Sequence, residues 1–360
     1  MSKYLIQLVL GKSGNVMNLN VASKIIIGFS TVLVFYIVAS VISVNILTGI
    51  DDAAKQVNDF ASPAQDRSNA IEISLLKQAN ISSSIPGVKT KDRLNSLKKE
   101  FSIIESALTS QRQALPPLLS SSSAINQLKQ FDLEYQGYLT EVNTMFALKD
   151  NNIALKEKVQ AEFNVLAESL NVIEEALIEL SYIEDEENES LVEQISSASV
   201  QIEGYIISIK DSLSEVPSLT EISAVVELQD TISLALTNTE PLFVYLGRLV
   251  EGHSSESQLN DIRQQYNAMT NSLESDNNLF QLQIATLTAL NQLSDSEKLQ
   301  KASSIQSIAA IESLSSLVKE RYKKQQGKII EHVAQGTTIT KAVVVIIFVL
   351  GGLIAFFTIR

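Results

Sequence analysis

Two long apolar stretches without charge flank a chain whose interior carries helical periodicity. The first runs from Ile25 to Ile50, which is 26 residues, and the second from Ala342 to Ile359, which is 18 residues. A helix that crosses the hydrocarbon core of a bilayer needs about 20 apolar residues. Both stretches are therefore predicted to span a membrane, and residues 51–340 are expected to lie together on one side of it.

The charges beside the first stretch predict its orientation. Lys3, Lys12 and Lys24 precede it, and Asp51 and Asp52 follow it. Positive flanks favour the cytoplasm, so we expect a cytoplasmic segment 1–24, a first span at 25–50, an outer region at 51–340 and a second span at 341–360. A cleaved signal peptide is the alternative for the first stretch, although its apolar run exceeds the roughly 7–15 residues of a typical signal sequence. Met17 is an alternative start.

Helix breakers divide the outer region into six expected helices. Only six prolines and 13 glycines occur in 360 residues, which suits long helices, and strand signals are nearly absent. Ser218 and Glu221 have the spacing of a capping box at the start of the fifth helix, and Pro241 is expected to kink that helix. The expected helices cover residues 52–84, 90–114, 120–181, 185–215, 218–252 and 257–340.

The third and sixth helices carry heptad seams, which are typical of near-parallel helix packing. In each helix two apolar halves are separated by a polar middle, which we call the waist. The third-helix seam contains Leu128, Phe131, Tyr135, Tyr138, Val142, Met145, Lys149, Asn152, Lys156, Val159, Phe163, Leu166, Leu170, Ile173, Leu177 and Leu180. The sixth-helix seam contains Phe280, Leu287, Leu290, Ser294, Glu297, Lys301, Ser304, Ile308, Ile311, Val318 and Tyr322.

These patterns predict an all-α fold of two stacked antiparallel four-helix bundles. Six helices build the bundles, the two long helices are shared, and two transmembrane helices flank them. The lower bundle is expected to comprise residues 51–148 and 305–340, and the upper bundle residues 149–304. The waist is either a satisfied junction between the two cores or a hinge that couples them; the absence of Gly and Pro there argues against a large bend.

The organisation resembles the helical bimodular sensor region of bacterial methyl-accepting chemotaxis proteins, which some sensor histidine kinases share. Met17-Asn18-Leu19 through Lys24 and Gly28-Phe29 is similar to a chemoreceptor amino terminus, and Phe356-Phe357-Thr358-Ile359-Arg360 to the exit of a second span into a HAMP helix. The resemblance covers the chain from about residue 17 onward and lies in the architecture. It implies a homodimer in the bacterial inner membrane that binds a small molecule, often an organic acid, in the periplasm. HAMP, the methylated helices and the kinase-contacting tip are not in the sequence.

One arginine is a candidate for binding an acidic ligand. A buried carboxylate needs a charge-assisted donor, and arginine supplies a bidentate one. The seam Val57, Phe60, Ala64, Arg67, Ile71, Ser74 and Gln78 places Arg67 toward the core of the lower bundle. The alternative is a structural arginine paired with Asp66, Glu134 or a neighbouring subunit. Counting residues from the membrane ends places Gln111, Arg112, Tyr135, Tyr138, Tyr322 and Gln325 at the same level, and these complete the predicted ligand site.

The upper bundle offers weaker signals. Twelve acidic residues and one lysine lie between Glu157 and Glu193, which indicates a solvated acidic face or, as an alternative, a site for an amine or a cation. An organic acid is favoured over an amine as the ligand. Arg248, Arg263, Tyr205 and Tyr245 are secondary candidates for an upper anion site.

Enzyme chemistry finds no support in the sequence. The chain has no Cys, two His and a net charge of −13, so thiolate metal sites are excluded. His253 and His332 lack carboxylate or histidine partners at metal-ligand spacing. We expect no catalytic residue, no metal and no cofactor. With no basic patch outside the termini, nucleic acid is not an expected partner.

Three functions remain open at this point. The first is the sensor and membrane portion of a chemoreceptor, in which ligand binding shifts the last helix and its span. The second is the input region of a sensor histidine kinase, which reads a periplasmic binding protein at the distal tip. The third is a membrane-anchored helical tether without a ligand.

Overall fold

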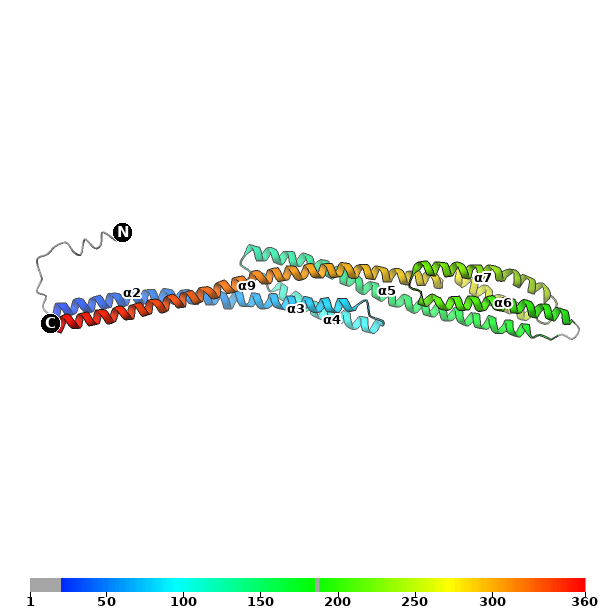
Figure 1. The fold of residues 1–360 in the computed structure, drawn as a ribbon, viewed down its shortest axis with the longest axis horizontal. Helices are drawn as coiled ribbons and strands as arrows, with labels where there is room; N and C mark the ends of the chain where they lie inside the picture. The colour runs from blue at the N-terminus through cyan, green and yellow to red at the C-terminus, as the bar shows by residue number, and fades with distance from the viewer. Residues whose placement is uncertain (1–20, 185–187, 360) are drawn as a thin grey trace. The chain divides into compact units, whose positions relative to one another are not determined.

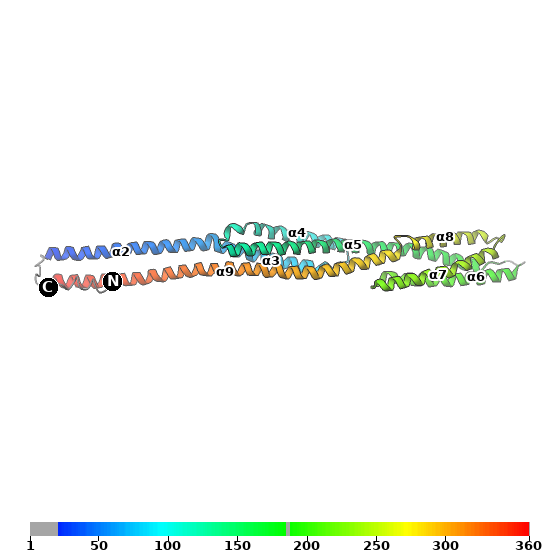
Figure 2. The same ribbon diagram turned by 90° about the horizontal axis from the view of Figure 1, so that it is seen from above.

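The computed structural model describes residues 21–184 and 188–359, and all its regular elements in these ranges are helices (Figures 1 and 2). The predicted all-α, helical-bundle fold class is confirmed. The predicted features at Lys3, Lys12, Met17 and Arg360 lie outside the described residues. The expected helix start at Asp185 also lies outside the described residues. The helix that follows, α6, runs from Glu189 to Glu215.

The first apolar stretch belongs to α2 (Val21–Lys55), which continues through the π-helix η1 (Gln56–Ala61) into α3 (Ser62–Ser84). Pro63 is the second residue after η1 and has no N–H to donate to the preceding turn, which accounts for the wide turn. Because a π-turn holds an extra residue, the buried face moves from the predicted Phe60 to Ala61. Phe60 is 39% exposed and Ala61 only 2%, so the predicted position of Phe60 is wrong.

The third expected helix is one uninterrupted helix, α5 (Ser122–Ser181), of 60 residues. It follows α4 (Lys91–Gln113) and a short 3₁₀ turn, η2 (Pro116–Leu118). Ser121 Oγ accepts the Ala124 N–H at 3.1 Å and caps the start of α5. The predicted seam of α5 is buried throughout, except that Lys156 is exposed and Phe163 is only partly buried.

The capping box predicted at Ser218 is wrong. Residues Val216–Ser218 form a 3₁₀ turn, η3, around Pro217, and the Ser218 hydroxyl donates to the Glu215 carbonyl at 2.7 Å. Leu219 is extended, so α7 begins only at Ile222 and ends at Leu249, with Pro241 inside it. The Glu221 side chain forms no capping hydrogen bond.

The sixth expected helix is two helices rather than one. α8 (Glu256–Glu274) is followed by its C-cap residue Ser275, and α9 (Leu279–Ile359) begins four residues after Ser275 and runs for 81 residues. Asn278 Oδ1 accepts the Gln281 N–H at 2.9 Å and caps α9. The sequence Ser-Asp-Asn-Asn carries this break without proline or glycine, because short polar side chains compete with the helix for backbone hydrogen bonds.

The chain divides into two compact units. The first unit comprises Met1–Ala70, Gln111–Asn126 and Glu312–Arg360, and the second comprises Ile71–Ser110 and Gln127–Ile311. The limits predicted for the lower and upper bundles differ from the limits of these two units, and the division into two bundles stays a prediction.

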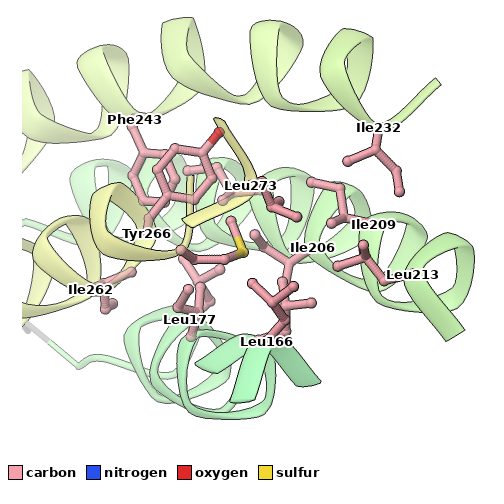
Figure 3. Close-up of a cluster of buried hydrophobic side chains, with 14 of the residues drawn as sticks. Leu166, Leu177, Ile206, Ile209, Leu213, Ile232, Phe243, Ile262, Tyr266 and Leu273 are labelled. Carbon is pink, nitrogen blue, oxygen red and sulfur yellow. The ribbon is translucent and has the colours of Figure 1, made fainter. Parts of the chain in front are cut away.

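The second unit contains an extensive apolar core contributed by α5, α6, α7 and α8. In Figure 3 the side chains of Leu166, Ile206, Phe243 and Ile262 point from these four helices toward one another. α6 and α7 lie side by side (Figure 1). The rings of Phe243 and Tyr266 approach to 4.7 Å between centroids. Four amphipathic helices thus bury their apolar faces together.

In the first unit, α2 and the C-terminal part of α9 run side by side (Figures 1 and 2). Each contains a window of mean hydropathy 2.6 without buried residues, long enough to cross a membrane. Glycines allow close packing, because a Cβ added at Gly28 would lie 2.9 Å from Ile354 and one at Gly336 would lie 3.2 Å from Ile46. The two apolar helices therefore pack as a pair.

Candidate functional site

Arg67 and Gln111 are brought together as predicted. Arg67 lies on α3 and Gln111 near the end of α4, and Arg67 Nη1 donates to Gln111 Oε1 at 3.0 Å. Arg67 is half-buried beside the fully buried Ser68. A half-buried guanidinium held by a neutral amide keeps its full charge available to an anion.

The guanidinium of Arg67 has an unused donor. Its Nε is buried and forms no hydrogen bond. Among the described residues, no ion pair to Arg67 is recorded, neither from Asp66 nor from Glu134. A buried donor without a partner costs about 1–3 kcal/mol, and a carboxylate that accepts from Nε would remove this cost.

Tyr135 and Tyr138 lie inside an aromatic cluster of the second unit and are 1% and 0% exposed. The Tyr135 ring stacks on Phe131 at 5.5 Å and on Tyr138 at 6.1 Å between centroids. Phe101 of α4 lies 6.4 Å from Tyr138. These rings are rigidly packed.

The two phenols hydrogen-bond to a polar layer. Tyr135 donates to Gln78 Oε1 at 3.1 Å, and Tyr138 lies 3.2 Å from Ser82 Oγ. Because Ser82 directs its own proton to the Ala79 carbonyl, Tyr138 is the donor in that pair. Gln300 Nε2 of α9 donates to the same oxygen at 3.0 Å. Burial raises the pKa of the Tyr138 phenol above its usual value of 10.0, so the phenol stays protonated.

The polar layer continues along α9 as a buried seam that was predicted only in part. Leu290, Ser294 and Lys301 were expected on the seam but are exposed. The predicted Ser304 is buried, and Ser296, Gln300 and Ser307, which were not predicted, are buried with it. Three atoms of the layer are buried without a hydrogen bond: Gln78 Nε2, Gln300 Oε1 and Ser307 Oγ. The sequence signal for this buried seam was the recurrence of uncharged polar residues at a spacing of three or four positions.

The remaining predicted site residues are more exposed. Tyr322 and Gln325 are half-buried on α9, and Tyr322 Oη accepts a hydrogen bond from Gln326 Nε2 at 2.8 Å. Arg112 is half-buried on α4. The ligand-binding role of the seven predicted residues stays a prediction. Among them, Arg67 and Gln111 share a hydrogen bond, and the rings of Tyr135 and Tyr138 stack.

On α5 the waist is buried and hydrogen-bonded at Lys149 and Asn152, whereas Lys156 is exposed. Lys149 is 5% exposed and donates through Nζ to the Pro86 carbonyl at 2.8 Å. Asn152 donates to the Thr286 carbonyl at 3.1 Å, while its Oδ1 has no hydrogen bond. Burial lowers the pKa of the Lys149 ammonium, and the charge of Lys156 lowers it further. α5 passes through the waist without interruption, as in a junction between two cores.

Two of the four secondary candidates of the upper region, Arg263 and Tyr245, have side-chain partners. Arg263 Nη2 pairs with Glu240 Oε1 at 2.9 Å, and Tyr245 donates to Gln194 Oε1 at 3.4 Å. Tyr266 is buried beside them and donates to the Leu236 carbonyl at 3.1 Å. Among the described residues, no group of three or more His, Cys, Asp and Glu side chains is arranged to hold a metal ion.

Comparison with known proteins bears on the fold. A scan against protein-family models and a search of curated proteins gave no match. Similar solved structures include the TorS sensor domain in complex with TorT in the presence of TMAO. It has 8% sequence identity and a TM-score of 0.53, and the match covers 71% of this chain and 99% of that chain.

A second similar structure is the sensor domain of the histidine kinase sensor TorS from V. parahaemolyticus. The identity is 9% and the TM-score 0.50, and the match covers 72% of this chain and 99% of that chain. At these identities the likeness shows the fold alone. The chain thus has a helical fold similar to that of the TorS sensor domains, and it contains two helices that are apolar enough to cross a membrane.

Proposed function

We propose that this chain is the input portion of a two-pass receptor in a bacterial inner membrane. Residues 51–340 sense in the periplasm and α9 carries the signal across the bilayer. The observation that carries the proposal is the continuity of α9, one helix of 81 residues from Leu279 to Ile359. Because a helix is stiff along its axis, a displacement of its buried half is delivered to its apolar half.

The receptor type favoured is the sensor histidine kinase. The similar structures are sensor domains of that class, and one of them is complexed with a partner protein, TorT, in the presence of TMAO. By analogy, the partners proposed here are a periplasmic binding protein and a small ligand. The chemoreceptor and the tether stay predictions, since neither similar structure is described as a chemotaxis protein.

The polar seam of α9 supports a two-state mechanism. Ser296, Gln300, Ser304 and Ser307 occupy positions where a static bundle would bury apolar side chains. Each unpaired buried polar atom costs about 1–3 kcal/mol, so an arrangement of α9 that pairs Gln300 Oε1 would recover that cost. A ligand or partner with different affinity for the two arrangements would shift their populations.

Arg67 is the proposed contact for an acidic ligand in the first unit. The Nε donor is unused, and Gln111 orients the guanidinium through its hydrogen bond with Nη1. A carboxylate bound there would gain charge-assisted hydrogen bonds. The homodimer and the inner-membrane location remain part of the proposal.

Disulfide cross-linking between the spans tests the proposal. The chain has no cysteine, so Ile46→Cys with Gly336→Cys introduces one defined pair at a close approach of α2 and α9. The full chain in nanodiscs is exposed to organic acids, to TMAO and to a purified periplasmic binding protein, and the oxidation rate is measured.

A receptor should change its cross-linking rate with at least one of these additions. If organic acids act through Arg67, Arg67→Ala removes their effect and leaves the rate without ligand unchanged. Each single-cysteine variant controls for cross-links between molecules. A rate that no addition alters would favour the tether.

A further inference from the structure

A pocket of the first unit lies outside the predicted ligand site. The π-helix η1 with the start of α3, the 3₁₀ turn η2, the start of α5 and α9 all contribute to it. Its volume is about 240 Å³. Arg67 and Gln111 do not line it, so it is described separately from the pair above.

The floor of the pocket is apolar because small side chains leave space there. Ala61 and Ala64 are each 2% exposed and face Leu118 and Val318 across the space. Ala61 reaches this position through the wide turn of η1, which sets it on the buried face. π-turns occur frequently at functional sites.

The rim of the pocket carries two cations and one anion, all from α9. Arg321 and Lys324 line it together with Glu320, so the lining has a net charge of one positive unit. Arg321 Nη2 lies 3.4 Å from Gln56 Oε1, a long contact with a neutral group. For the described residues, no ion pair within 4 Å is recorded for Arg321 or Lys324, so both charges are available to a ligand.

We propose that this pocket binds a small organic monoanion with a short apolar body. The body lies against Ala61, Ala64 and Leu118, and the carboxylate accepts charge-assisted hydrogen bonds from Arg321 and Lys324. At roughly 30 Å³ per water-sized position, the volume holds about eight non-hydrogen atoms. That size is below the roughly 300–1,000 Å³ of drug-sized sites and suits a medium-chain carboxylic acid.

A lipid headgroup does not fit the position of the pocket. Lys324 precedes Lys341, at the edge of the second apolar stretch, by 17 residues. At 1.5 Å per residue this is about 26 Å of helix, which is too far for a headgroup to reach from the bilayer surface. The anion is therefore a free molecule.

Calorimetric titration of the full chain in zwitterionic nanodiscs tests the pocket, with hexanoate as the probe and hexanol and hexylamine as the uncharged and cationic counterparts. Hexanoate is expected to bind at least tenfold more tightly than either counterpart. Lys324→Ala is expected to weaken hexanoate about tenfold. Lys323→Ala is the matched control, since Lys323 is an exposed neighbour that does not line the pocket, and it should leave affinity unchanged.

Several outcomes would overturn the proposal. Equal binding of hexanol, no effect of Lys324→Ala, or an equal effect of Lys323→Ala would each contradict a carboxylate at the rim. Loss of hexanoate binding in nanodiscs that contain anionic phosphatidylglycerol would identify a lipid headgroup as the occupant. Arg67→Ala should leave hexanoate affinity intact. If hexanoate binds but the cross-linking rate between α2 and α9 does not change, the pocket proposal is supported and the receptor proposal is contradicted.

Discussion

Replacing Lys149 by methionine is expected to stabilise the second unit at neutral pH by about 1–2 kcal/mol. The Lys149 ammonium is buried, and its recorded hydrogen bond goes to the Pro86 carbonyl at 2.8 Å. Such a charged hydrogen bond contributes about 1.5–3 kcal/mol. Removing an unpaired ion from water costs several kcal/mol. Methionine keeps most of the side-chain volume and avoids that cost, and Pro86 is partly exposed, so water can satisfy its carbonyl.

The effect should depend on pH with a defined sign. The pKa of Lys149 is lowered from 10.5, first by burial and then by Lys156. The unfolded chain therefore holds this proton more tightly than the folded chain. The free energy of unfolding must rise with pH between the lowered pKa and 10.5. Lys149→Met removes this rise, so the advantage of the variant is largest below the folded pKa and shrinks as pH increases.

Urea unfolding of the full chain, followed by far-ultraviolet circular dichroism from neutral pH to about pH 10, measures both effects. The chain has no cysteine, so alkaline solution introduces no thiol chemistry. Lys158→Met is the matched control, because Lys158 is exposed on the same helix. A destabilised Lys149→Met protein whose unfolding free energy follows the same pH slope as the wild type would refute the reasoning.

Three further substitutions test the packing and the helix ends by the same unfolding assay. Tyr138→Phe removes the hydrogen bond to Ser82 and should lower the free energy of unfolding by about 1 kcal/mol. An unchanged free energy of unfolding would mean that water in the unfolded chain hydrogen-bonds the phenol as well as Ser82 does in the folded chain. Leu170→Ala, at a position with no exposed surface, should cost about 2–5 kcal/mol, and a cost below 1 kcal/mol would indicate a core that collapses into the gap. Asn278→Ala removes the side-chain acceptor of the Gln281 N–H and should cost about 1 kcal/mol, whereas Asn278→Asp, which keeps that acceptor, should cost less.

A long helix could be predicted from the sequence where the spacing of its apolar residues stays regular over many turns. The seam of α5 repeats over 60 residues, so a local misfit such as the exposed Lys156 leaves the register intact. The break between α8 and α9 was missed because it contains neither proline nor glycine. Its signal was the run from Ser275 to Asn278, in which short polar side chains supply the turn and the cap of the next helix.

The candidate site could be predicted only in part. Counting residues from the membrane ends placed Arg67 level with Gln111, and the two are hydrogen-bonded. The same count could not say which way the phenols point, and those of Tyr135 and Tyr138 bond to Gln78 and Ser82. Side-chain direction depends on packing against all neighbours at once, and one sequence does not contain that information.

The wide turn of η1 also has a consequence for tolerance to deletion. A regular α-helix that loses one residue rotates everything beyond the gap by about 100°, which moves the buried face to solvent. Within Gln56–Ala61 the chain already holds an extra residue, so a shortened chain can relax there into ordinary α-helical turns. A one-residue deletion within this turn should therefore leave the protein folded, whereas a one-residue deletion in the adjoining parts of α2 or α3 should destabilise it.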